Sequence, residues 1–131
     1  MKTISTWKTG QEFESLQDHN IIEIDGNRKK GFSPKALLLA GLGACSGIDV
    51  VEILEKMRVD FSGLVIETMT EQTEEHPRVF KDIQLVYCVK TAKENEDKVR
   101  KAIDLSLEKY CGVSAMLKKN SPIHYQLLIE S

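Results

Sequence analysis

The chain has 131 residues, of which 41% are hydrophobic and 29% charged, a composition typical of one soluble globular domain spanning residues 1–131. A net charge of −2 gives no electrostatic reason to expect nucleic acid or an anionic membrane as a partner. The first residues hold no apolar stretch of signal-peptide length, so we expect the protein to stay in the cytoplasm.

Short strands are predicted in the first third of the chain, over roughly 2–8, 11–16 and 20–24. Thr9-Gly10 marks the first turn, and Asp25-Gly26-Asn27 follows the third strand. Arg28-Lys29-Lys30 is then a basic loop, which is either solvated or a binding patch.

A long helix is predicted to begin at Pro34, with Ser33 as its N-cap, and to run to about Arg58. It is apolar on most faces as far as Leu54, so we expect a buried central helix. One stripe of it consists of small residues that would let another backbone come close: Ala36, Ala40, Gly43 and Gly47.

The second half of the chain alternates between strand and helix patterns. The predicted order βββ-α-ββ-αα-β indicates an α+β fold with a mainly antiparallel sheet. The elements expected are strands over 63–72 and 79–90, a helix over 94–109, a break at Tyr110-Cys111-Gly112, a short helix ending near Lys119, and a strand over 123–130.

Three cysteines are an odd number, which excludes a complete disulfide framework. Cys45 is either a small core residue or a reactive thiol with space beside it, since Gly41 and Asp49 lie one helical turn away. Cys111, at the break, is either an ordinary buried cysteine or an exposed and movable thiol, and Cys88 is expected to be structural. The histidines form no metal-ligand pattern with the cysteines, so we expect no zinc site: His19, His76 and His124.

Two segments resemble the cysteine motifs of the OsmC/Ohr family. The first runs from Gly31 through Ser33-Pro34 to Cys45, and the second from Leu105 to Val113 around Cys111. Pro77 and Phe80, before an alternating strand, also match, and the run from Ser46 to Leu54 is most similar to the YhfA-like branch of that family.

The resemblance implies the OsmC/Ohr-like fold, an intertwined homodimer with active sites at the subunit interface, and thiol-dependent reduction of organic hydroperoxides. Cys45 aligns with the peroxidatic cysteine, which attacks as a thiolate and becomes a sulfenic acid. Cys111 aligns with the resolving cysteine, which forms the disulfide that a dithiol reductant then opens. The family uses no metal and no organic prosthetic group, so no cofactor is expected.

The chain departs from the family pattern beside the first motif. The well-studied peroxidases have a Glu after the Pro, and it holds an N-terminal Arg against the thiolate. Here Lys35 follows Pro34 and no Arg precedes Arg28, so this ion pair is not carried over. Two alternatives to a peroxidase therefore stay open: a protein of the same fold that binds an apolar or thiol-reactive small molecule with little or no turnover, and a structural dimer with inert cysteines.

Overall fold

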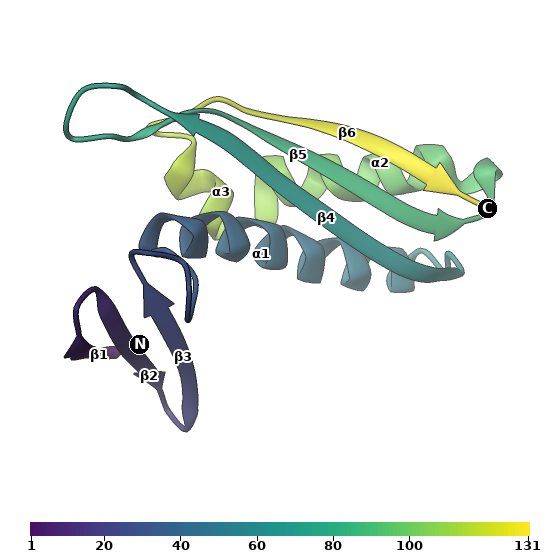
Figure 1. Ribbon diagram of the computed structural model, residues 1–131. Helices are drawn as coiled ribbons and strands as arrows, with labels where there is room; N and C mark the ends of the chain where they lie inside the picture. The colour runs from purple at the N-terminus through teal and green to yellow at the C-terminus, as the bar shows by residue number, and fades with distance from the viewer. The chain divides into compact units, whose positions relative to one another are not determined.

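The order of elements agrees with the sequence prediction in the computed structural model, which describes all 131 residues. Figure 1 shows their arrangement within the two compact units, Met1–Leu39 and Ala40–Ser131. The elements are β1 (Ile4–Thr9), β2 (Glu12–Gln17), β3 (Asn20–Asp25), α1 (Pro34–Lys56), β4 (Phe61–Gln72), β5 (Phe80–Thr91), η1 (Lys93–Asn95), α2 (Glu96–Leu105), η2 (Ser106–Tyr110), α3 (Gly112–Leu117) and β6 (Ile123–Glu130).

The N-terminal unit holds an antiparallel sheet in the order β1-β2-β3. Trp7 pairs with Phe13, and Phe13 pairs with Ile24, so these apolar side chains share one face with Ile22. That face is largely uncovered, with Trp7 64% and Ile22 47% exposed. No buried hydrophobic residue of the chain precedes Leu42, so this sheet has no core of its own.

The loop after β3 is organised by Asp25. Its buried carboxylate accepts backbone N–H groups from Asn27 at 2.8 Å, Lys30 at 3.1 Å and Lys29 at 3.2 Å. These bonds, led by the one from Asn27, hold the pKa of Asp25 below its ordinary value. The basic residues of this loop are therefore fixed by their backbone, with Arg28 in the left-handed region at φ 59°.

The larger unit is a three-stranded sheet, in the order β4-β5-β6, with helices on one face (Figure 1). β4 and β5 are antiparallel, whereas β5 and β6 are parallel, so the sheet is mixed. Four alternate residues of β5 point toward the core and are fully buried: Ile83, Leu85, Tyr87 and Val89.

The long helix predicted from Pro34 is present, but it is not buried on all faces as expected. Its buried residues lie along one side, while Ile48 on the opposite side is 60% exposed. By length and composition alone α1 would be able to span a membrane, which is weak evidence because core helices of soluble proteins share these properties. The helix is thus covered by its own chain on one side only.

The small residues of α1 face side chains of β4 rather than a second backbone, which corrects the prediction. A Cβ at Gly43 would lie 3.4 Å from Thr68 Cγ2, and one at Gly47 would lie 3.1 Å from Ile66 Cδ1. Glycine at position 47 therefore lets the helix lie against β4 at a distance that a larger residue would disturb.

The single helix predicted over 94–109 is divided. A 3-10 turn (η1) leads into α2, and α2 ends in a π-helical turn over Ser106–Tyr110. This turn is closed by the Cys111 N–H, which donates to the Ser106 carbonyl at 2.7 Å. The extra residue in the turn ends the helix at Cys111, whose backbone is extended.

Candidate thiol site

The structure brings Cys45 and Cys111 together. Cys45 lies on α1 and Cys111 directly after the π-turn, and their side chains are close enough for Cys45 to contribute to the raised pKa of the Cys111 thiol. Both are free thiols, as is Cys88. Two thiols that the fold brings near each other are candidates for a disulfide.

Cys45 is the more accessible of the two. Its side chain is half-buried, although the sequence analysis placed it in the most buried helix. The next residue, Ser46, is fully buried, so the helix turns Ser46 toward the core and leaves Cys45 at the margin.

Cys111 is 2% exposed, and this corrects the alternative of an exposed, movable thiol. Its sulfur caps α3 by accepting the Ser114 N–H at 3.3 Å. Burial raises the pKa of the Cys111 thiol, the Ser114 N–H opposes that increase, and the nearby Cys45 adds to it. Cys111 is therefore held as a neutral thiol.

Cys88 lies outside this site. It occupies β5 between Val65 of β4 and Leu128 of β6. Its neighbour Tyr87 points toward α1, where its hydroxyl meets Ser46, so Cys88 points to the opposite face of the sheet. For Cys88 to form a disulfide with either of the other thiols, β5 would have to rotate so that its opposite face pointed toward α1.

A chain of buried hydroxyl groups lies beside the thiol pair, and the sequence analysis did not find it. The Ser46 hydroxyl is 2.6 Å from the Tyr87 hydroxyl and 2.8 Å from the Ser106 hydroxyl. Ser106 donates to Asp49 Oδ2 at 2.9 Å. Ser46, Tyr87 and Ser106 are each fully buried. We call Tyr87, Ser46, Ser106 and Asp49 the hydroxyl chain.

The hydroxyl chain is linked to both cysteines. Ser46 follows Cys45 on α1, and the Ser106 carbonyl accepts the N–H of Cys111. Burial raises the pKa of Tyr87 to about 12, against the opposing hydrogen bond from Ser46, and Cys111 adds to the increase electrostatically. Tyr87 is therefore neutral at physiological pH.

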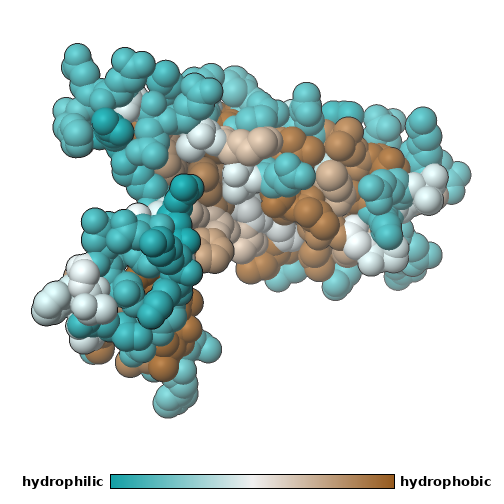
Figure 2. Space-filling model, viewed as in Figure 1, coloured by the Kyte–Doolittle hydropathy of each residue, from teal (hydrophilic) through white to brown (hydrophobic).

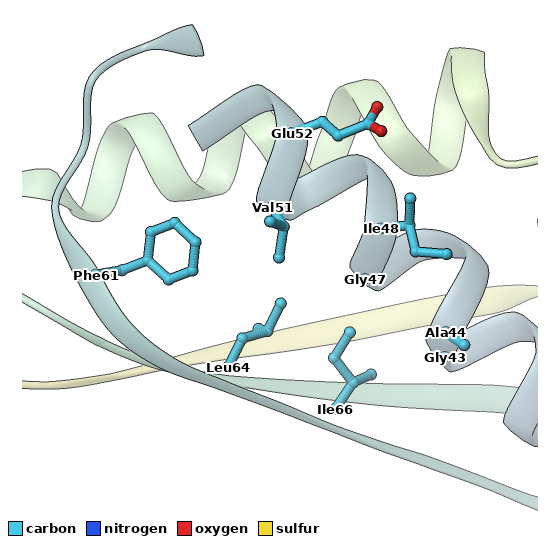
Figure 3. Close-up of a pocket in the computed structure, with 9 residues that line it drawn as sticks. All are labelled: Gly43, Ala44, Gly47, Ile48, Val51, Glu52, Phe61, Leu64 and Ile66. Carbon is cyan, nitrogen blue, oxygen red and sulfur yellow. The ribbon is translucent and has the colours of Figure 1, made fainter. Parts of the chain in front are cut away.

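An open groove of about 740 Å³ lies between α1 and β4 next to this site. Figure 3 shows Val51, Phe61 and Leu64 pointing into it, and the Glu52 carboxylate pointing away. Cys45 does not line the groove, but its neighbours Ala44 and Ile48 do. The lining is largely apolar: Gly43, Ala44, Gly47, Ile48, Val51, Glu52, Phe61, Leu64 and Ile66. In Figure 2 hydrophobic residues gather on this unit.

No group of three or more His, Cys, Asp or Glu side chains lies close enough to hold a metal ion.

Comparisons with known proteins identify the family and the fold. A family model described as "OsmC-like protein" matches residues 26–126. Protein YhfA of Escherichia coli K12 is 41% identical over 116 residues, 86% of each chain. An OsmC-like protein from Mycoplasma pneumoniae has the same fold, with a TM-score of 0.88 at 17% identity, over 99% of this chain and 96% of that one. The organic hydroperoxide resistance protein OhrB of Bacillus subtilis aligns with a TM-score of 0.66 at 18% identity, over 96% of both chains.

The fold and the paired thiols define a small α+β protein that carries two adjacent free cysteines. The chain belongs to the OsmC/Ohr family, and its similarity to YhfA confirms the branch that the sequence indicated.

Proposed function

We propose that the protein is a thiol-dependent peroxidase that reduces organic hydroperoxides through Cys45 and Cys111. The observation that carries the proposal is the proximity of the two thiols, since Cys45 lies close enough to affect the pKa of Cys111. A sulfenic acid formed on one sulfur would have a nearby thiol to reduce it. The name of OhrB refers to hydroperoxide resistance, and at 18% identity its similarity supports the fold alone.

The exposure of the two sulfurs supports the order of steps. The accessible Cys45 thiolate attacks the peroxide oxygen, the O–O bond breaks, and an alcohol leaves, with Cys45 as its sulfenic acid. The buried Cys111 then displaces hydroxide, which leaves as water, and a Cys45–Cys111 disulfide forms. An external dithiol reduces this disulfide and restores both thiols.

We also propose that the working form is a homodimer in the cytoplasm. The N-terminal sheet exposes an apolar face without a core, and the α1–β4 groove is apolar as well. A second copy would cover both surfaces, and obligate interfaces of this kind bury more than roughly 2,000 Å². Covering the groove would leave a narrower apolar space beside Cys45, suited to the organic part of a hydroperoxide.

The test is consumption of cumene hydroperoxide in the presence of a dithiol. Cys45→Ser is expected to abolish turnover, because no other accessible thiol lies at the site. Cys111→Ser is expected to allow the first turnover and then to leave Cys45 over-oxidised. Cys88→Ser is the matched control and is expected to turn over at the wild-type rate. Equal turnover in wild type and Cys45→Ser would contradict the proposal.

The neutral, buried Cys111 favours one alternative, a protein that binds an apolar or thiol-reactive small molecule with little turnover. This function is expected to give saturable binding of cumene hydroperoxide or cumyl alcohol without peroxide consumption. The two assays on one preparation separate the functions.

A further inference from the structure

Ser106 is the point at which the two thiol-bearing segments of the chain meet. It begins the π-turn before Cys111, and its carbonyl accepts the N–H of Cys111 at 2.7 Å. Its hydroxyl reaches the other way, to α1, where it lies 2.8 Å from the Ser46 hydroxyl and donates to Asp49 Oδ2 at 2.9 Å. One residue therefore holds Cys111 through its backbone and α1 through its side chain.

The two partners of Ser106 on α1 are close to Cys45 in the helix. Ser46 directly follows Cys45, and Asp49 lies one helical turn after it. Because an ionised carboxylate can only accept, Ser106 donates to Asp49 and accepts from Ser46. The Ser46 hydroxyl is held in turn from β5 by the Tyr87 hydroxyl at 2.6 Å. The two bonds of Ser106 thus form together, and they hold the π-turn beside the part of α1 that carries Cys45.

The hydrogen bonds of Ser114 to Cys111 stay within one segment of the chain. The Cys111 sulfur accepts the Ser114 N–H at 3.3 Å. The Ser114 hydroxyl lies 3.0 Å from the carbonyl oxygen of Cys111 and 3.2 Å from that of Leu107. These bonds tie Cys111 to α3 and to the π-turn, and they would move with that segment if it shifted relative to α1. The bonds of Ser106, in contrast, cross to α1 and oppose such a shift.

Burial makes the contact between Ser46 and Ser106 sensitive to displacement. Both side chains are fully buried, and a buried hydroxyl that loses its partner destabilises the protein. A disulfide also tolerates only a narrow range of geometries, with its two Cα atoms usually within about 7 Å. A shift of the π-turn along α1 would therefore strain or prevent the bond between Cys45 and Cys111.

We propose that Ser106 is a positioning residue, which holds Cys111 at the distance from Cys45 that disulfide formation requires and so stabilises the disulfide. The inference rests on the proposed two-cysteine chemistry. Ser106 acts through the backbone of Cys111 rather than on the reacting sulfur atoms. Ser46 and Asp49 act one step further away, by holding Ser106.

A purely structural role for Ser106 has a different consequence. A buried hydroxyl that only stabilises the fold does so equally in the oxidised and the reduced protein, so its loss lowers both free energies of unfolding by the same amount. The unfolded chain closes the disulfide with the same propensity whichever residue stands at position 106. The equilibrium between dithiol and disulfide in the folded protein then stays unchanged. It shifts only if the hydroxyl favours the geometry of the disulfide, so this equilibrium separates the two roles.

The experiment measures this equilibrium in buffers of reduced and oxidised glutathione, in a Cys88→Ser background. The S–S bond of glutathione disulfide breaks as the bond between Cys45 and Cys111 forms, and two electrons and two protons pass from the protein to two glutathione thiols. Free thiols are trapped by alkylation, and mass spectrometry gives the fraction of each form. Because no hydroperoxide is used, failure of the peroxidase proposal would appear only in the turnover assay.

Ser106→Ala is expected to lower the equilibrium constant for disulfide formation about tenfold, an effect typical of one hydrogen bond. Its reduction potential would then be about 30 mV less negative, since the couple transfers two electrons. Asp49→Ala removes one of the two partners of Ser106 and is expected to lower the constant about fivefold. Asp49→Asn keeps an oxygen that accepts the bond, so it is expected to stay within about twofold of the parent.

Ser121→Ala is the matched control. Ser121 is 1% exposed, and its hydroxyl donates to the Phe80 carbonyl at 3.1 Å, so this substitution also removes a bonded, buried serine hydroxyl. It is expected to lower the free energy of unfolding as Ser106→Ala does, but to leave the equilibrium constant within about twofold of the parent.

An equilibrium constant in folded Ser106→Ala equal to that of the parent would overturn the inference. Equal shifts in Ser106→Ala and Ser121→Ala would also overturn it, as would a parent that forms no disulfide between Cys45 and Cys111 at any glutathione ratio. If Ser106→Ala does not fold, the half-exposed position 49 decides the question. Equal constants for Asp49→Ala and Asp49→Asn would then reject the inference.

Discussion

Burial makes the Cys111 thiol less reactive in the folded protein than an ordinary exposed cysteine. We expect iodoacetamide to modify Cys45 before Cys111 in the folded protein, and Cys111 to react at least about tenfold faster once the chain is unfolded. A raised pKa means that the thiolate is populated only at higher pH. The alkylation rate of Cys111 is therefore expected to keep increasing above about pH 8.5, the ordinary value for cysteine.

Mass spectrometry of peptides after timed labelling measures each site in the same sample. The unfolded chain in denaturant is the control, since there both thiols lose their surroundings. If the alkylation rate of Cys111 stopped increasing with pH below about pH 8.5, a cation or a further hydrogen-bond donor would have to stabilise its thiolate.

At the residue scale the sequence pointed to the thiols but not to their surroundings. Cys45 and Cys111 could be selected because each lies in a recognisable motif. Ser46 and Ser106 could not, because their hydrogen bond joins residues 60 positions apart. The burial of Tyr87 could be predicted, but its partner could not. The alternation of β5 placed it on the buried face, and a buried tyrosine hydroxyl needs a partner, but nothing in the sequence identified which one.

At the scale of elements, two glycines of α1 differ in how closely they lie against β4. Gly43→Ala is expected to increase the free energy of unfolding by up to about 1 kcal/mol, because alanine favours helix and the new Cβ makes an ordinary contact with Thr68. Gly47→Ala is expected to gain less or to destabilise, because its Cβ would lie 3.1 Å from Ile66 Cδ1.

Ile66→Val removes that methyl group and supplies the control. Combined with Gly47→Ala it is expected to be less destabilising than the sum of the single changes, whereas combined with Gly43→Ala it is expected to be additive. Chemical denaturation of the three single and two double variants measures this difference. Additivity in both pairs would mean that α1 can move away from β4 without lowering the free energy of unfolding.

Two departures from the predicted elements each have a physical reason. The apolar pattern of α1 predicted its length and its start at Pro34. It did not indicate which of the apolar sides of the helix packs against the rest of the same chain. The π-turn before Cys111 was read as a simple break, because one extra residue in a helical turn leaves no distinct spacing in the sequence.

At the scale of the whole molecule, the proposed homodimer gives a prediction about neighbouring residues of β3. Ile22 lies on the apolar face with Trp7 and Phe13, and Ile21 lies on the opposite face, which also holds Glu14 and Glu23. Ile22→Lys is expected to weaken dimerisation at least about tenfold, because the interface would bury an unpaired charge. Ile21→Lys introduces the same charge at a site of similar exposure, 57% against 47%, and is expected to remain dimeric.

Light scattering over a range of protein concentrations measures both variants beside the wild type. A wild-type protein that stays monomeric at micromolar concentration would contradict the homodimer. Equal weakening by the two substitutions would place the interface on both faces of the sheet.

The N-terminal sheet also affects how the protein is made. Residues 4–25 leave the ribosome before any of the side chains that form the core, which runs from Leu42 to Cys111. A sheet that leaves its apolar face in water buries little apolar surface to stabilise it. We therefore expect this sheet to fold after the core, and in the interval its exposed Trp7 and Phe13 are the side chains that a chaperone would meet.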